Sequence, residues 1–131
     1  MSQKLRVLVV DDVAMYRDMA CAFLSAAGHE ATTADGGNEA VAEVISSCFD
    51  VVLMDVRMPE VDGLEATRRI RGLAGARANV AIIGLTAQSF AEQVAACREA
   101  GMDDHLAKPY TPDLLNQIVA RAALLAQARA A

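Results

Sequence analysis

The stretch VVLMDVRMPEVDG occupies residues 51–63 and contains the pattern that decides the fold. Its apolar run, rich in β-branched residues, predicts a buried strand over residues 50–54 that ends on the carboxylate of Asp55. The MP and DG dipeptides that follow predict a loop. Over residues 63–73, apolar and basic residues then recur at helical spacing. The sequence here therefore predicts a strand, a loop and a helix in succession.

The same unit of strand, loop and helix recurs on both sides of this stretch. Apolar runs predict the other strands at residues 5–10, 30–34, 80–85 and 104–107. Helical spacing predicts the other helices at residues 13–27, 38–47 and 89–100 and from residue 112 onward. The expected N-caps are Asn38, Ser89 and Thr111, the last followed by Pro112 at the first helical position. Residues 72–79 form the most linker-like stretch.

This alternation predicts an α/β fold, in which a doubly wound, five-stranded parallel sheet is covered by helices on both faces. The chain has 131 residues, close to the commonest size of one domain, and we see no internal repeat. Residues 1–131 are therefore expected to form a single domain. In open sheets of this kind, ligands bind beyond the carboxyl ends of the strands.

The composition argues against several classes of protein. The net charge is -5 and the basic residues are dispersed, which argues against direct binding of nucleic acid. No stretch approaches the roughly 20 apolar residues of a membrane span, so we expect a soluble, cytoplasmic protein without membrane insertion. Cys21, Cys48 and Cys97 are expected to be free thiols. His29 and His105 lack a second ligand at the spacing of a metal site.

Polar side chains fall at the expected carboxyl ends of four strands. They are Asp11 and Asp12 after the first strand, Asp55 after the third, Thr86 after the fourth and Lys108 after the fifth. Adjacent strands lie about 5 Å apart, so one edge of the sheet would gather these side chains into one pocket. Two carboxylates about 4 Å apart repel each other by about 4 kcal/mol at an effective dielectric constant of about 20. A hard divalent cation is therefore expected, and Mg²⁺ suits best because it keeps waters and is commonly shared with a phosphate.

Such a pocket would contain the parts needed for phosphoryl transfer to a carboxylate. Asp55 is the expected nucleophile, and Lys108 and Thr86 would contact the phosphoryl oxygens. Asp12 and Asp55 would hold the ion, with Asp11 acting directly or through water. Taken alone, each residue also has an ordinary interpretation, since an acid pair or a threonine can cap a helix and a lysine can be a surface charge. We favour a site because independent surface residues have no reason to fall at the same end of four strands.

The chain resembles the receiver domain of two-component response regulators over residues 5–125. The motifs that match in order and spacing are Val9-Val10-Asp11-Asp12, Met54-Asp55-Val56-Arg57-Met58-Pro59, Asp62-Gly63, Leu85-Thr86-Ala87 and Lys108-Pro109. The resemblance implies a flavodoxin-like receiver fold with strand order 2-1-3-4-5. It also implies a phosphorylation-dependent signalling switch, in which a histidine kinase or a histidine phosphotransfer protein phosphorylates Asp55 with Mg²⁺ bound.

The resemblance further implies roles for particular residues. The Mg²⁺ ligands would be Asp12, Asp55 and the main-chain carbonyl of Arg57, with Asp11 in the outer coordination sphere. The peptide bond between Lys108 and proline is typically cis in the family. The chain would not be an enzyme in the usual sense, because it would promote only its own phosphoryl transfer and autodephosphorylation.

Family members couple phosphorylation to output through a hydroxyl group and an aromatic residue. The hydroxyl here is that of Thr86, which Ala87 follows, and the aromatic position on the fifth strand holds His105. Histidine departs from the usual Tyr or Phe, so we expect weakened or altered coupling; the alternative is that His105 only lies at the sheet edge. Arg57 and Gln88 occupy positions from which they would tune the lifetime of the phosphoryl group, although Arg57 also fits a merely solvated side chain.

Several functions remain open at this point. The leading expectation is a stand-alone receiver that signals by contact through the face formed by the fourth helix, fifth strand and fifth helix. The alternative is a receiver domain of a hybrid histidine kinase, which residues 63–71 resemble. A flavodoxin-like cofactor binder would need a phosphate-cradling loop where Asp11 and Asp12 stand. A phosphohydrolase with an aspartyl nucleophile would want an acid in place of Arg57.

Overall fold

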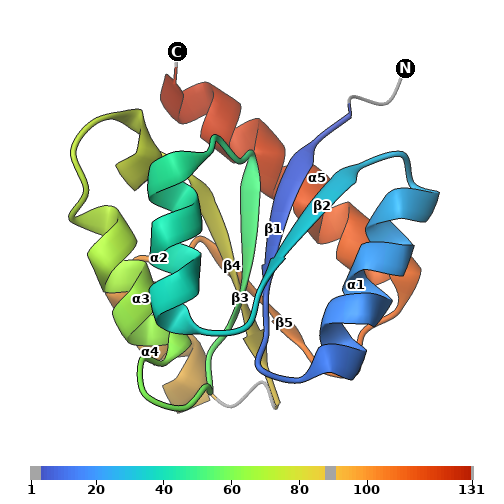
Figure 1. Ribbon diagram of the computed structural model, residues 1–131, viewed down its shortest axis with the longest axis horizontal. Helices are drawn as coiled ribbons and strands as arrows, with labels where there is room; N and C mark the ends of the chain where they lie inside the picture. Colours follow the sequence, from blue (N-terminus) through green and yellow to red (C-terminus); the bar gives the residue numbers. More distant parts are fainter. Residues whose placement is uncertain (1–3, 88–90, 131) are drawn as a thin grey trace.

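The computed structural model describes residues 4–87 and 91–130, and within them five strands form one sheet (Figure 1). All strand pairs are parallel, and the order is β2-β1-β3-β4-β5. The strands are β1 (Arg6–Val10), β2 (Glu30–Ala34), β3 (Val51–Asp55), β4 (Ala81–Thr86) and β5 (Asp104–Ala107). The expected α/β fold and its strand order are confirmed.

Helices cover both faces of the sheet (Figure 1). They are α1 (Ala14–Ala26), α2 (Gly37–Ser46), α3 (Gly63–Arg71), α4 (Ala91–Ala100) and α5 (Pro112–Ala130), with a short 3-10 helix, η1 (Ala76–Asn79), before β4. Successive strand side chains point to opposite faces. Val9 therefore belongs to the core under α1 and α5, whereas Leu8 belongs to the core under α2, α3 and α4. Among the described residues, no helix is both long enough and apolar enough to cross a membrane.

Capping residues place the helices that flank the candidate site. The Asp62 carboxylate accepts a hydrogen bond from Glu65 N (2.8 Å) at the start of α3. The Thr111 hydroxyl accepts from Leu114 N (3.2 Å) at the start of α5, which confirms the predicted cap. Gly101 follows α4 with a φ of +108°, a conformation that glycine adopts without strain.

The cap predicted at Asn38 is wrong. Helix α2 begins at Gly37, after Gly36, and no side chain caps it. Gly37 packs so closely on Val61 that a Cβ at this position would overlap the Val61 side chain and carbonyl. Asn38 lies inside the helix, and its Oδ1 accepts a hydrogen bond from Arg69 Nη1 (2.9 Å). Helix α2 therefore starts at a closely packed glycine and without a side-chain cap.

The linker-like stretch over residues 72–79 connects α3 to β4. It contains η1, and the guanidinium of Arg71 donates to the carbonyls of Ala78 (2.8 Å) and Val80 (2.6 Å). These hydrogen bonds could not be predicted, because main-chain acceptors leave no mark on the sequence. The predicted cap at Ser89 lies outside the described residues.

Of the three cysteines, Cys97 is buried, Cys21 is partly buried and Cys48 is exposed. Cys21, Cys48 and Cys97 are free thiols. His29 Nδ1 accepts a hydrogen bond from Leu5 N (3.1 Å), so this histidine ties the start of β1 to the chain before β2.

Candidate functional site

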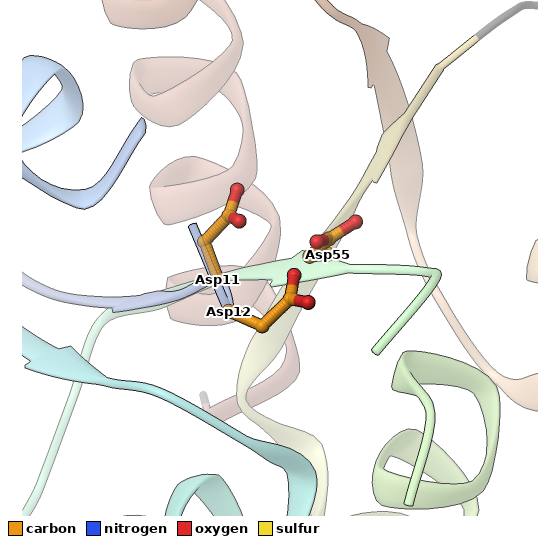
Figure 2. Close-up of side chains that lie close together, drawn as sticks. All are labelled: Asp11, Asp12 and Asp55. Carbon is orange, nitrogen blue, oxygen red and sulfur yellow. The ribbon is translucent and has the colours of Figure 1, made fainter. Parts of the chain in front are cut away.

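Three carboxylates meet at the carboxyl edge of the sheet (Figure 2). Asp11 and Asp12 directly follow β1, and Asp55 is the last residue of β3. Since β1 and β3 are neighbours, with Val10 opposite Met54, the residues that follow are brought side by side. One oxygen from each carboxylate lies within 4.8 Å of the others. Asp11 and Asp55 are buried and Asp12 is exposed, so the cluster opens to solvent beside Asp12.

Lys108 brings an ammonium group into this cluster from the end of β5. Its Nζ lies 2.7 Å from Asp11 Oδ2 and 3.4 Å from Asp55 Oδ2. No hydrogen bond of good geometry reaches Asp11 Oδ2 within the described residues, but this buried oxygen is paired with the Lys108 ammonium at 2.7 Å. Lys108 N donates to the carbonyl of Thr86 (2.7 Å), and the bond from Lys108 to Pro109 is cis, as the resemblance implies.

Burial and the neighbouring charges set the protonation of the site. Burial raises the pKa of Asp55, the charge of Asp11 and a hydrogen bond with Asp12 raise it further, and Lys108 and the Arg57 amide lower it, with a result of about 7. Burial alone would lower the pKa of Lys108, but Asp11 and Asp55 together outweigh it and raise that pKa. Three acids thus face one ammonium group. Carboxylate oxygens are the ligands that Mg²⁺ prefers, so the residues present fit this ion.

Thr86 ends β4 with an unused hydroxyl group. The residue is 1% exposed, and its Oγ1 has no hydrogen-bond partner among residues 4–87 and 91–130. Its neighbour Leu85 lies opposite Asp55 in the register of β3 and β4. A buried hydroxyl without a partner costs free energy unless a ligand or water bonds to it. Thr86 therefore has a free donor close to the end of the strand that carries Asp55.

Of the other residues proposed from the sequence, the structure describes Arg57, Ala87 and His105. The side chains of Arg57 and Ala87 are exposed, and Arg57 takes part through its main-chain amide, which donates to Asp55 Oδ1 (3.3 Å). His105 lies in β5 and is half-buried, with Nδ1 4.0 Å from Asp104 Oδ1. Gln88 lies outside the described residues.

Two residues beside the site, Arg17 and Tyr16, were not found from the sequence, and Gly63 was found there only as part of a motif. A Cβ at Gly63 would overlap the carbonyl of Asp55, so the glycine lets α3 pack directly against the end of β3. Arg17 Nη1 donates to the carbonyl of Asp11 (2.8 Å). The ring of Tyr16 lies over Lys108, with Nζ 4.3 Å from the ring centroid. For Gly63 there was a signal, because it belongs to the Asp-Gly pair, but Arg17 and Tyr16 carry none.

Comparison with protein families and curated proteins agrees with this geometry. The family model of the response regulator receiver domain matches residues 7–120. The chain is 39% identical over 114 residues to the sensor histidine kinase RcsC of Salmonella typhimurium, an alignment that covers 87% of this chain and 12% of that protein. It is 40% identical over 116 residues to the CAI-1 autoinducer sensor kinase/phosphatase CqsS of Vibrio cholerae, covering 88% of this chain and 17% of that protein. The chain therefore spans less than a fifth of the length of these relatives.

Solved structures with a similar fold include a receiver domain and a chemotaxis protein. The receiver domain of sensor histidine kinase PA1611 from Pseudomonas aeruginosa has a TM-score of 0.85 and 34% identity, covering 92% of this chain and 98% of that one. That structure holds a magnesium ion coordinated in its active-site cleft. The chemotaxis protein CheY4 of Vibrio cholerae has a TM-score of 0.85 and 31% identity, covering 92% of this chain and 99% of that one.

Proposed function

The chain belongs to the response regulator receiver domain family, and on that premise we propose that Asp55 accepts a phosphoryl group from a histidine kinase or a histidine phosphotransfer protein. It is a signalling module, homologous to the receiver domains of hybrid sensor kinases. One observation supports the proposal most directly. Asp55 is buried at the end of β3, 3.4 Å from Lys108 Nζ and in one cluster with Asp11 and Asp12.

Each residue of the cluster has its own role in the proposed phosphoryl transfer. One carboxylate oxygen of Asp55 forms a bond to phosphorus while the bond from phosphorus to the donor's imidazole nitrogen breaks, and that nitrogen keeps the electron pair. Lys108 Nζ, held until then by Asp11 and Asp55, turns toward the negative oxygens of the transferring group. The buried Thr86 hydroxyl donates to a further phosphoryl oxygen. The Arg57 amide orients the Asp55 carboxylate.

A bound Mg²⁺ is part of the proposal. Asp12, Asp55 and the main-chain carbonyl of Arg57 would hold the ion, with Asp11 in its outer coordination sphere. When bound, the ion supplies the positive charge that allows a negative phosphoryl group to approach a carboxylate. In this chain Asp11 has a second task, because its carboxylate keeps the Lys108 ammonium at the site.

The proposal is tested by incubation with acetyl phosphate and Mg²⁺, followed by intact mass measurement. The expected result is a gain of one phosphoryl group that requires Mg²⁺, is blocked by EDTA and is absent in Asp55→Asn. The matched control is Asp18→Asn, which removes an exposed carboxylate of α1 and should be modified like the wild type. A modification that persists in Asp55→Asn would contradict the assignment. Turnover of phosphomonoesters would instead favour a phosphohydrolase.

The residues that tune and transmit phosphorylation form a separate part of the proposal. From the family resemblance, Arg57 and Gln88 are the residues proposed to affect loss of the phosphoryl group by autodephosphorylation, and Ala87 belongs with Thr86 to the proposed switch. If Arg57→Ala and the wild type lose the phosphoryl group at equal rates, Arg57 has no part in this. Thr86 and His105 pass the change to the face of α4, β5 and α5. Phosphorylation that alters partner affinity equally in wild type and His105→Ala would exclude His105 from this path.

The proposal also covers the extent of the domain and the kind of signalling system to which it belongs. The two cores on opposite faces of one sheet support a single receiver domain over residues 1–131. The similarity to sensor kinases supports a phosphorelay of the hybrid-kinase type, and a stand-alone receiver is the other form of the same function. The cytoplasmic location expected from the sequence stays a prediction.

A further inference from the structure

The ammonium group of Lys108 has an aromatic neighbour as well as its two carboxylates. Its Nζ lies 4.3 Å from the centroid of the Tyr16 ring. This is well inside the distance of about 6 Å at which an aromatic face attracts a cation. The Lys108 side chain is only 12% exposed, so water screens the attraction weakly. The ammonium is therefore enclosed by Asp11, Asp55 and the face of Tyr16.

Tyr16 reaches this position because the first turn of α1 contacts both Asp11 and Lys108. Next to it, Arg17 Nη1 donates to the carbonyl of Asp11 (2.8 Å). The Tyr16 ring also contacts Tyr110, with 6.4 Å between ring centroids, and Tyr110 follows Lys108 by two residues. Tyr16 thus connects the helix that fixes Asp11 with the loop that carries Lys108.

We propose that Tyr16 is a positioning residue for phosphoryl transfer, whose ring keeps the Lys108 ammonium beside Asp55 while that ammonium changes partner from Asp11 to the incoming phosphoryl group. This inference rests on the proposed phosphorylation of Asp55. A carboxylate holds a donor in a defined direction, whereas an aromatic face attracts a cation over a range of positions. The ring therefore restrains the flexible lysine side chain without fixing it in one geometry. The face of the ring carries this role, and the tyrosine hydroxyl is not needed for it.

Packing alone is the competing role for Tyr16. Together with Tyr110 and Phe23 it forms an aromatic group, in which Phe23 meets Tyr110 edge-on at 6.2 Å between centroids. Among the cation–π contacts of the described part of the chain, Lys108 pairs with Tyr16 and not with Phe23. Phe23→Leu is therefore the matched control, because it removes a ring from the same group without removing a neighbour of the ammonium.

The test compares the rate of Asp55 phosphorylation by acetyl phosphate at saturating Mg²⁺ in the wild type and three variants. Tyr16→Leu should react about 3- to 10-fold more slowly, the size expected for one partly buried cation–π contact. Tyr16→Phe keeps the ring face and should restore the rate to within about twofold of the wild type. Phe23→Leu should also react at nearly the wild-type rate.

Two further measurements separate positioning from packing. In a Lys108→Gln background there is no cation over the ring, so Tyr16→Leu should cause no additional loss of rate. In the NMR spectrum, the Lys108 methylene protons next to Nζ should show an upfield ring-current shift. That shift should persist in Tyr16→Phe and Phe23→Leu and disappear in Tyr16→Leu.

The possible outcomes distinguish this inference from the proposed function. If the wild type gains no phosphoryl group at Asp55, the proposed function fails and the role of Tyr16 fails with it. If the wild type is modified and Tyr16→Leu reacts equally fast, only the role of Tyr16 is overturned. Equal slowing with and without Lys108 also overturns it, because the effect would then be packing. Should Tyr16→Leu not fold, ordinary Lys108 shifts in the wild type would overturn it as well.

Discussion

Two ionic clusters lie at opposite edges of the sheet, and they differ in how completely their polar groups are paired. The amino-edge cluster comprises Arg71, Asp103 and Arg129, next to the starts of β4 and β5. Arg71 donates four hydrogen bonds, three of them to main-chain carbonyls and one to Asp103. Asp103 also accepts from two nitrogens of Arg129 and from the amide of Ile82. The cluster holds two guanidinium groups and one carboxylate, and the protein itself supplies the hydrogen-bond partners of Arg71 and Asp103.

The carboxyl-edge cluster of Asp11, Asp12, Asp55 and Lys108 is incomplete by comparison. Three acids face one ammonium, and the nearby Thr86 hydroxyl has no partner in the described part of the chain. Acidic and basic side chains therefore have different roles at the two edges of the sheet. A saturated cluster stabilises the fold, whereas an unsaturated one keeps groups available for a cation and a phosphoryl group.

The largest expected effect on stability comes from breaking the amino-edge cluster. Arg71→Met should lower the free energy of unfolding by about 2 to 4 kcal/mol, because three carbonyls and Asp103 lose a partly buried donor. Urea denaturation measures this loss. The matched control is Arg68→Met in the same helix, where the exposed pair with Glu65 should contribute less than about 1 kcal/mol. If both variants lose the same free energy of unfolding, the amino-edge cluster contributes no more to stability than an exposed ion pair does.

At the carboxyl edge, removing a charge should stabilise the protein when Mg²⁺ is absent. The pKa of Asp55 is raised to about 7, so the folded state binds more protons than the unfolded state between about pH 4 and 7, and stability falls as pH rises through this range. Asp55→Asn should therefore raise the free energy of unfolding by about 1 to 3 kcal/mol at pH 8 and have little effect near pH 4. Urea denaturation at both pH values tests this. If Asp55→Asn instead lowers the free energy of unfolding at pH 8, the charge of Asp55 does not destabilise the folded state.

Mg²⁺ should stabilise the protein through the carboxyl-edge cluster and not through the amino-edge cluster. At free Mg²⁺ about ten times Kd, binding should stabilise the wild type by about 1.4 kcal/mol at pH 8, measurable as a rise in Tm that EDTA reverses. The rise should be smaller at pH 5.5, where Asp55 is largely protonated, and in Asp55→Asn. Arg71→Met should show the same rise as the wild type, because the amino edge does not hold the ion. A rise that is independent of Asp55 would point to binding elsewhere.

The smallest effect is expected for Arg129. Arg129→Gln should lower the free energy of unfolding by no more than about 1 kcal/mol, because Asp103 keeps Arg71 as a partner and Arg129 is more exposed than Arg71. Urea denaturation beside Arg71→Met measures the difference. A loss as large as that of Arg71→Met would mean that Arg129, and not Arg71, holds the amino-edge cluster together.

The two edges also differ in how far they could be predicted from the sequence. The carboxyl edge was predictable because parallel strands place their last residues together, so Asp11, Asp55 and Lys108 were expected at one edge. The amino edge was not, because Arg71 mainly contacts main-chain carbonyls, which every residue has. The start of α2 was missed for a similar reason, since the packing of Gly37 on Val61 leaves no local pattern.

Gly63 contributes no functional group, yet it controls how near α3 comes to the nucleophile. A Cβ there would overlap the Asp55 carbonyl, so any larger residue must push apart the helix and the strand that carries Asp55. Substitution at this position would thus change reactivity through size alone. A chain with every polar residue of the site intact but a bulkier residue at position 63 would keep the chemical motif and lose the spacing on which it depends.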